Sequence, residues 1–404
     1  MTTKSRSVAL AVWMTASIFY AYQYILRVMP NIMIDEIMAQ FHLSSASFGQ
    51  FSGIYYIGYS LIHIPVGILL DRFGPKKVMT GCILLTTLGL TPLIFSEHWL
   101  FPTLGRLLIG IGSSAAILGV FKIIRMIFSA ERFPRMLSLS VTIGLIGAIY
   151  GGGPVSFMRD MLGYQPVIQI LIVAGVVLAL ATYWIVPNIK EAPKASVMSN
   201  IKEVVTHKKV MASCFLAGLM VGPLEGFADV WGTVYLKQVY GYEGTLAASL
   251  PSMIFIGMCF GAPVLSFIAD KIKSYLGTIV GSAILMALAF GLLVSGTMPG
   301  GVISLSFVIV GICCAYQILA IYKASTYVRE EVAGLTTAVA NMIIMIFGYV
   351  FHAIIGFVVG SLGGPSNANA LIAGVSVIPG ALIVAAIGYT ILWSKERRLA
   401  KSPN

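Results

Sequence analysis

The sequence predicts an all-α membrane protein with twelve transmembrane helices arranged as two six-helix bundles. The chain has 404 residues, of which 58% are hydrophobic and 10% are charged, and its mean hydropathy is +0.92. An ordinary soluble domain carries roughly 25% charged residues, so this chain has too little polar surface to coat a soluble globule. Its apolar residues form long blocks, and at about 20 residues per span such blocks predict helices that cross a bilayer.

Twelve apolar blocks can be counted along the chain. The first follows Lys4 and Arg6 and is longer than the roughly 7–15-residue apolar region of a signal peptide, so we interpret it as a retained span. The predicted cores lie at about 8–34, 48–70, 77–96, 100–126, 136–157, 165–187, 210–236, 246–269, 275–297, 301–327, 333–360 and 369–393.

Basic residues predict the orientation of these spans. Lys and Arg gather at both termini and after the even-numbered spans, whereas the opposite loops hold Arg159 and Lys237. The positive-inside rule then places both termini of this predicted multi-pass membrane protein in the cytoplasm. This distribution accounts for the net charge of +11 without a nucleic-acid partner.

A polar stretch divides the chain into two halves. It predicts an N-terminal bundle over 1–190, a cytoplasmic linker over 191–208 and a C-terminal bundle over 209–404. Asp71 and Asp270 follow the second and eighth spans and lie 199 residues apart, while Lys122 and Lys323, late in the fourth and tenth spans, lie 201 apart. A nearly constant offset is typical of parallel repeats related by an axis along the membrane normal.

The loop after the second span carries a motif, which reads Gly67-Ile-Leu-Leu-Asp71-Arg72-Phe-Gly74-Pro-Lys76-Lys77. It resembles the cytoplasmic signature of the major facilitator superfamily, G-x-L-x-D-R-x-G-R-[RK], with proline in place of the first basic residue. We expect Gly67 to permit close helix approach, Asp71 to pair with a neighbouring helix end, and Arg72 and Lys76 to hold the cytoplasmic face. The resemblance implies a conformational gate, and Asp270 lies in a degenerate echo of the motif.

Two further segments extend the resemblance. Arg106 through Gly112 is similar to the family pattern R-x-x-x-G-x-G, and Tyr20 through Pro30 resembles a bacterial branch of nutrient importers, some of which are linked to amino acids or nucleosides. The glycines of the fifth span, from Gly144 to Gly153, lack the family's antiporter order G-x-x-x-G-P, so we interpret them as a small-residue helix contact.

Ionisable residues inside the spans are the main candidates for a functional site. They fall on the first, fourth, seventh and tenth helices, which the resemblance implies line a central cavity: Arg27, Arg106, Lys122, Arg125, Glu225, Asp229 and Lys323. Charges within a membrane are costly and usually face a cavity or a partner. The repeat offset places the counterpart of Arg27 between Glu225 and Asp229, so an ion pair broken by substrate or protons is one prediction. A permanent salt bridge near the membrane surface is the alternative.

Neighbouring polar residues complete the candidate set. Tyr20, Gln23, Tyr24 and Arg27 share one face of the first helix, and we add Tyr56 together with Tyr316 and Gln317 as substrate contacts. Lys122 and Lys323 form a symmetric pair that could attract an anionic group, whereas Arg125 is expected to reach the membrane interface. Arg106 is either a hydrogen-bond hub or a proton-coupling residue.

These features predict a secondary transporter that moves a small anionic or zwitterionic, amino-acid-like solute by alternating access with proton symport. Arg27 would hold a carboxylate or phosphate, and Glu225 or Asp229 would take up the proton. A proton-independent uniporter and a non-transporting solute sensor are the alternatives. No phosphate-binding loop, nucleophile elbow or metal-ligand spacing appears, so the sequence predicts no enzyme, no cofactor and no metal site. A monomer suffices for this architecture.

Overall fold

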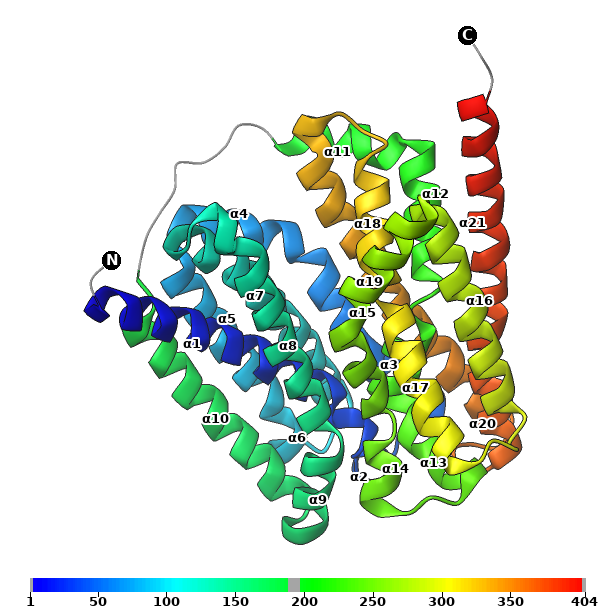
Figure 1. Cartoon of the computed structure of the whole chain (residues 1–404). Coiled ribbons are helices and arrows are strands. Elements are labelled where there is room, and N and C mark those ends of the chain that lie inside the picture. Colours follow the sequence, from blue (N-terminus) through cyan, green and yellow to red (C-terminus); the bar gives the residue numbers. More distant parts are fainter. Residues whose placement is uncertain (1–2, 188–196, 402–404) are drawn as a thin grey trace. The chain divides into compact units, whose positions relative to one another are not determined.

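A computed structural model describes residues 3–187 and 197–401, and this part of the chain is built from helices without strands (Figure 1). The chain divides into two compact units. Unit 1 comprises Met1–Ala195 with Gly244–Ser249, and unit 2 comprises Ser196–Glu243 with Leu250–Asn404. The predicted all-α class is confirmed.

Unit 1 is organised around α1, which packs on α8, α7 and α10, while α7 also packs on α3 and α5. Its main helices are α1 (Thr3–Val28), α2 (Ile34–Phe41), α3 (Ser45–Leu61), α4 (His63–Phe73), α5 (Pro75–Leu90), α6 (Pro92–Phe95), α7 (Leu100–Ile127), α8 (Phe133–Gly151), α9 (Gly153–Leu162), α10 (Tyr164–Ile185) and α14 (Gly244–Ser249).

Unit 2 repeats the long apolar helices with more interruptions. Its helices are α11 (Val197–Thr206), α12 (Lys208–Gly218), a π-helical segment η3 (Gly222–Trp231), α13 (Gly232–Tyr240), α15 (Ser252–Ile272), α16 (Tyr275–Val294), α17 (Gly300–Cys314), α18 (Tyr316–Ser325), α19 (Glu330–Ser361), α20 (Ala368–Val375) and α21 (Val377–Lys401).

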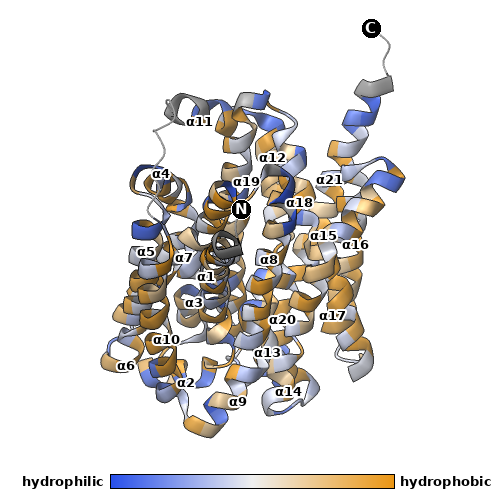
Figure 2. Ribbon diagram, turned by 60° about the vertical axis from the view of Figure 1, so that its left-hand side comes forward, coloured by the Kyte–Doolittle hydropathy of each residue, from blue (hydrophilic) through white to orange (hydrophobic). Residues whose placement is uncertain are grey.

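The predicted number of spans agrees with the structure. In the described residues, 11 helical segments are long and apolar enough to cross a membrane, and the pair α3 and α4, bent by 48°, makes a twelfth when it is counted as one span. Figure 2 shows hydrophobic residues along the middle of these helices and hydrophilic residues gathered near their ends. The chain is therefore a multi-pass membrane protein.

Glycines set the closest helix approaches in both units. A Cβ on Gly58 or Gly110 would overlap backbone of the facing helix in the α3–α7 pair of unit 1, and a Cβ on Gly257 or Gly311 would do so in the α15–α17 pair of unit 2. The unit 2 glycines follow their unit 1 counterparts by 199 and 201 residues, the offsets found in the sequence. Small residues let membrane helices pack backbone to backbone, so the same packing device recurs in both halves of the repeat.

Adding a methyl group at Gly110 is expected to destabilise unit 1. In Gly110→Ala the new Cβ would overlap the carbonyl oxygen of Tyr55, and overpacking of this kind typically costs about 1–3 kcal/mol. Gly81→Ala is the matched control, because a Cβ there meets nothing within 4 Å. Thermal unfolding of the purified proteins should show a lower melting temperature for Gly110→Ala only, and equal melting temperatures would contradict the packing account.

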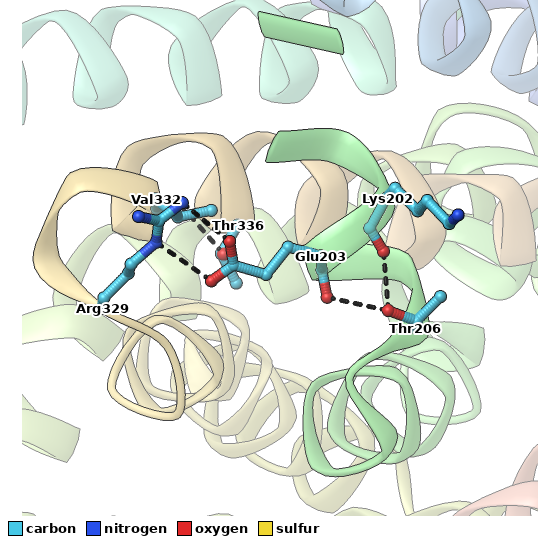
Figure 3. A network of polar contacts seen from close by, with 6 residues as sticks. All are labelled: Lys202, Glu203, Thr206, Arg329, Val332 and Thr336. Atoms are coloured by element: carbon cyan, nitrogen blue, oxygen red, sulfur yellow. Dashed lines mark hydrogen bonds and ion pairs between the residues drawn. The ribbon is translucent and has the colours of Figure 1, made fainter. Parts of the chain in front are cut away.

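The predicted linker, 191–208, lies partly outside the described residues, which resume at 197. From there α11 packs on α19. Arg329, just before α19, donates from Nε and Nη2 to the two carboxylate oxygens of Glu203 on α11, at 3.2 and 2.9 Å (Figure 3). Both side chains are well exposed, so we expect this fork-shaped pair to fix orientation more than to add stability.

Candidate functional site

A cluster of aromatic and polar side chains surrounds Arg27 in unit 1. The Arg27 side chain is 7% exposed, and its guanidinium carbon lies 5.0 Å from the ring centre of Tyr24 and 5.3 Å from that of Tyr56. Tyr20 packs edge-on against Tyr24, and Gln23 accepts a 2.7 Å hydrogen bond from the Tyr55 hydroxyl. The four predicted residues of the first helix are thus buried, and each of them contacts an aromatic side chain.

Arg106 joins three helices of the same unit. Its guanidinium donates to the carbonyl of Leu26 on α1 at 2.7 Å and to that of Ser52 on α3 at 3.2 Å. The helical partner of the Leu26 carbonyl would be the backbone N–H of residue 30, but Pro30 has none. Arg106 therefore donates to a carbonyl whose usual helical donor is missing at Pro30. This favours the role of Arg106 as a hydrogen-bond hub over a role in proton coupling.

Removing the Arg106 guanidinium is expected to destabilise the protein. Arg106→Gln would leave buried carbonyls short of a donor, at about 1–3 kcal/mol for each unsatisfied group. Arg125→Gln is the control, because Arg125 is exposed at the last turn of α7. Thermal unfolding should show a clear drop for Arg106→Gln alone, and a melting temperature equal to wild type would contradict the hub.

The glycines of the fifth span make the predicted small-residue helix contact, and Gly144 and Gly147 make it with the first helix. A Cβ on Gly144 would lie 2.6 Å from the ring of Tyr20, and one on Gly147 would overlap the backbone of Ala21. Helix α8 can therefore approach α1 closely, and the Tyr20 ring lies between Gly144 of α8 and the Tyr24 ring. The small-residue helix contact is confirmed.

Asp71 of the motif after the second span forms an ion pair with Lys122, a partner that the sequence did not predict. Lys122 Nζ on α7 lies 2.8 Å from Asp71 Oδ1 at the end of α4. Gly74 has a φ of +83°, a conformation that favours glycine, and it joins α4 to α5, which begins at Pro75. The expectation for Gly67 was wrong, because a Cβ there meets nothing within 4 Å and no close helix approach depends on it.

The remaining motif residues lie nearby along α4 and α5. Arg72 is exposed and its guanidinium carbon lies 5.3 Å from the centre of the Phe73 ring, while Lys76 Nζ lies 4.5 Å from the centre of the Tyr183 ring on α10. Both cations thus lie against rings of their own unit. An aromatic partner of this kind holds an exposed cation in place without neutralising it.

Unit 2 pairs its equivalent lysine differently. Lys323 Nζ lies 3.0 Å from Glu396 Oε2 on α21, and Asp270, the sequence counterpart of Asp71, is exposed. Tyr327 donates to the other Glu396 oxygen at 2.5 Å. Burial raises the pKa of the Tyr327 hydroxyl, and its hydrogen bond to the Glu396 carboxylate raises that pKa further. Because each lysine already has a carboxylate partner, each attracts an added anion less than a bare ammonium would.

Two acids lie in the π-helical segment of unit 2. Glu225 and Asp229 are 1% and 0% exposed, and every residue of Gly222–Trp231 is buried. His352 on α19 contacts the backbone carbonyl of Glu225 through Nε2 at 2.5 Å, and a carbonyl only accepts, so Nε2 carries a proton. π-Helical turns are rare and often occur at functional sites. The wide turn holds both carboxylates within the buried part of unit 2.

Helix α18 places two predicted residues beside α12. The Tyr316 hydroxyl donates to the Ala217 carbonyl at 2.6 Å, which makes Tyr316 a link between the two helices. Gln317 is 8% exposed, and within the described residues its side-chain nitrogen makes no hydrogen bond. A buried donor without a partner calls for an explanation, and a bound solute or water supplies one.

Sequence reasoning missed Tyr55 and Glu396, and it did not identify the partner of His352. Tyr55 contacts both Gln23 and Arg106, yet it follows no charged residue in the sequence and neighbours the more obvious Tyr56. His352 and Glu396 reach their partners from helices far along the chain. The charged Glu396 near the end of an apolar span was a signal that the sequence offered. Whether Tyr55 or Tyr56 contacts Gln23 and Arg106 depends on how the helices pack, which only the structure shows.

The comparison with known families agrees with this architecture. The model described as Major Facilitator Superfamily matches residues 13–353, which is most of the chain. The chain belongs to the Major Facilitator Superfamily. Solved structures of this superfamily share its fold: a bacterial homologue of the human lysosomal transporter Spinster has a TM-score of 0.76 at 17% identity, covering 97% of each chain. The nucleoside transporter NupG has a TM-score of 0.78 at 16% identity, covering 96% of this chain and 99% of its own.

The curated relatives that sequence comparison finds are only distantly similar to this chain. The uncharacterized transporter YybO of Bacillus subtilis is 26% identical over 55% of this chain, and the matched part spans about half of the length of YybO, 52%. A quinolone resistance transporter of Acinetobacter baumannii is 24% identical over 45% of this chain and 43% of its own length. A nitrite extrusion protein of Bacillus subtilis is 20% identical over 79% of each chain. Their names differ in solute, so membership of the superfamily leaves the solute open.

Proposed function

We propose that this chain is a secondary transporter that carries a small anionic or zwitterionic solute, such as an amino-acid-like compound, across the inner membrane of a bacterium by alternating access with proton symport. Both termini lie in the cytoplasm in this proposal, as the distribution of basic residues predicts. Its partners are the solute, protons and the lipid bilayer, and a monomer carries out the cycle.

The observation that carries the proposal is the buried guanidinium of Arg27. An ionised side chain within a membrane span is costly and is usually functional. The ring centres of Tyr24 and Tyr56 lie within 5.3 Å of its guanidinium carbon, and such contacts stabilise a cation. The edge of the guanidinium carries the N–H donors that match a carboxylate or phosphate. Tyr20, Gln23 and Tyr56 then select the shape of the solute.

The buried polar groups of unit 2 support the coupling part of the proposal. Glu225 and Asp229 are the acids that would take up a proton, because both lie in the π-helical segment of a membrane span, where ionisable side chains are rare and usually functional. Gln317 supplies a buried donor for the solute, and Tyr316 stabilises the helix that carries it. Asp71 and Lys122 form the gate contact, with Gly74, Arg72 and Lys76 around it and Asp270 at the equivalent loop of unit 2.

Uptake into proteoliposomes tests the proposal. The purified protein is reconstituted with an acidic exterior, and labelled amino acids, organic acids, nucleosides and neutral sugars are offered in turn. We expect carboxylate or phosphate compounds to accumulate against their gradient and a protonophore to abolish the accumulation. Uptake of neutral compounds alone would overturn the anion site. Equilibration that a protonophore does not change would indicate a uniporter, and ligand binding without net flux would indicate a sensor.

A further inference from the structure

A groove in unit 1 lies apart from the Arg27 cluster. It has a volume of about 790 Å³ and is formed by the beginning of α1, the end of α7 and the beginning of α8. Ligand pockets in proteins are typically about 300–1,000 Å³, so the groove is large enough for a substantial ligand. It lies at the end of unit 1 where the basic residues predict the cytoplasmic surface.

One end of the groove is strongly basic. Arg132 and Arg135 line it and both are exposed, and the described residues provide no carboxylate within ion-pair distance of either guanidinium. Neighbouring Glu131 is not among the lining residues, and Arg125 lies against the ring of Phe133 instead. Two guanidinium groups without an acid partner favour a phosphate, which they can bind through parallel N–H donors.

Apart from Ser129, the other residues that line the groove are apolar. Leu10 on α1 and Leu139 on α8 are 43% and 44% exposed, and Phe128 lies at the end of α7. Trp13 forms part of the wall, and its indole N–H donates to Ser140 Oγ at 2.7 Å, which fixes the ring between α1 and α8. A free phosphate ion would leave this apolar surface exposed, whereas the acyl chain of a lipid would cover it.

We propose that this groove binds one anionic phospholipid of the cytoplasmic leaflet, with its phosphate on Arg132 and Arg135 and an acyl chain along Leu10, Trp13 and Leu139. Basic pockets between helices on the cytoplasmic side of a membrane protein are suited to such headgroups. The lipid would bridge the ends of α1, α7 and α8. This proposal does not depend on the solute or on proton coupling.

Native mass spectrometry of the full chain tests it. The protein is titrated with an equimolar mixture of phosphatidylglycerol and phosphatidylethanolamine, and we expect a retained phosphatidylglycerol adduct. R132Q/R135Q should weaken that adduct by about tenfold or more, which corresponds to about 1.4 kcal/mol. K395Q/R398Q is the matched control, because it removes two exposed charges from α21 and leaves the groove intact.

Three results would overturn the proposal: equal adducts in wild type and R132Q/R135Q, an equal loss in K395Q/R398Q, or equal retention of the two lipids. Glycerol phosphate added in excess separates a lipid from a simple phosphate ligand. Even in excess it should not displace the lipid, since it lacks an acyl chain, and displacement would also overturn the proposal. If the double variant is not recovered folded, R132Q and R135Q are measured singly, and each should weaken the adduct.

Discussion

Replacing Arg27 with glutamine is expected to abolish the stabilisation of the protein by carboxylate or phosphate ligands. A hydrogen bond to a charged group contributes about 1.5–3 kcal/mol, so the loss of a two-pronged contact should weaken binding by about a hundredfold or more. A ligand that binds only the folded state raises its melting temperature. The measurement is thermal unfolding of wild type and Arg27→Gln against the panel of compounds used for uptake.

Two further variants separate recognition from folding. Arg27→Lys keeps the charge but loses the planar fork, so we expect a ligand response smaller than wild type and larger than that of Arg27→Gln. Arg125→Gln removes a charge from an exposed position and should respond as wild type does. If Arg27→Gln keeps the full ligand response, Arg27 is a structural residue held by Tyr24 and Tyr56, and the solute binds elsewhere.

The sequence predicted the helical class, the approximate spans and the repeat because each depends on composition or on spacing along the chain. It did not predict the bend after Leu61 or the π-helical turn at Gly222–Trp231. Hydropathy averages over about 20 residues, and a bend or a wide turn leaves that average unchanged. The edges of individual helices therefore emerged only from the structure.

The candidate residues were found more readily than their partners. Buried charges are conspicuous in an apolar sequence, so Arg27, Glu225 and Lys122 could be named without a structure. The pairing of Lys122 with Asp71 depends on the packing of α4 on α7, across 51 residues of chain, and no local pattern reveals it. For Gly67 the sequence predicted a contact that the structure lacks. The residue matches the family motif, but a Cβ added there would face open space.

Glu225→Gln is expected to abolish accumulation driven by a pH gradient while leaving exchange of labelled for unlabelled solute intact. Glutamine has nearly the same shape as a protonated glutamate but cannot release a proton, so the variant permanently mimics the protonated state. Net proton-coupled transport requires release in each cycle, whereas exchange requires only solute turnover. Accumulation should fall to equilibration, a loss of up to about tenfold if wild type couples one proton to a one-unit pH gradient.

The control for this experiment is Glu243→Gln, an exposed acid after α13, which should accumulate solute as wild type does. Undiminished pH-driven accumulation in Glu225→Gln would remove Glu225 as the proton site and leave Asp229→Asn as the next variant. Loss of exchange together with accumulation would instead assign Glu225 to solute binding.

Combining Arg27→Gln with Glu225→Gln then tests whether the guanidinium and the carboxylate serve the same solute. Residues that share a ligand couple by about 0.5–3 kcal/mol, whereas independent residues give additive effects. Additive losses in the affinity for solute would separate the two roles. If Glu225→Gln alone also weakens solute binding, a double variant no weaker than Arg27→Gln would show that the acid acts through the solute that Arg27 holds, which is the link between binding and proton uptake that symport requires.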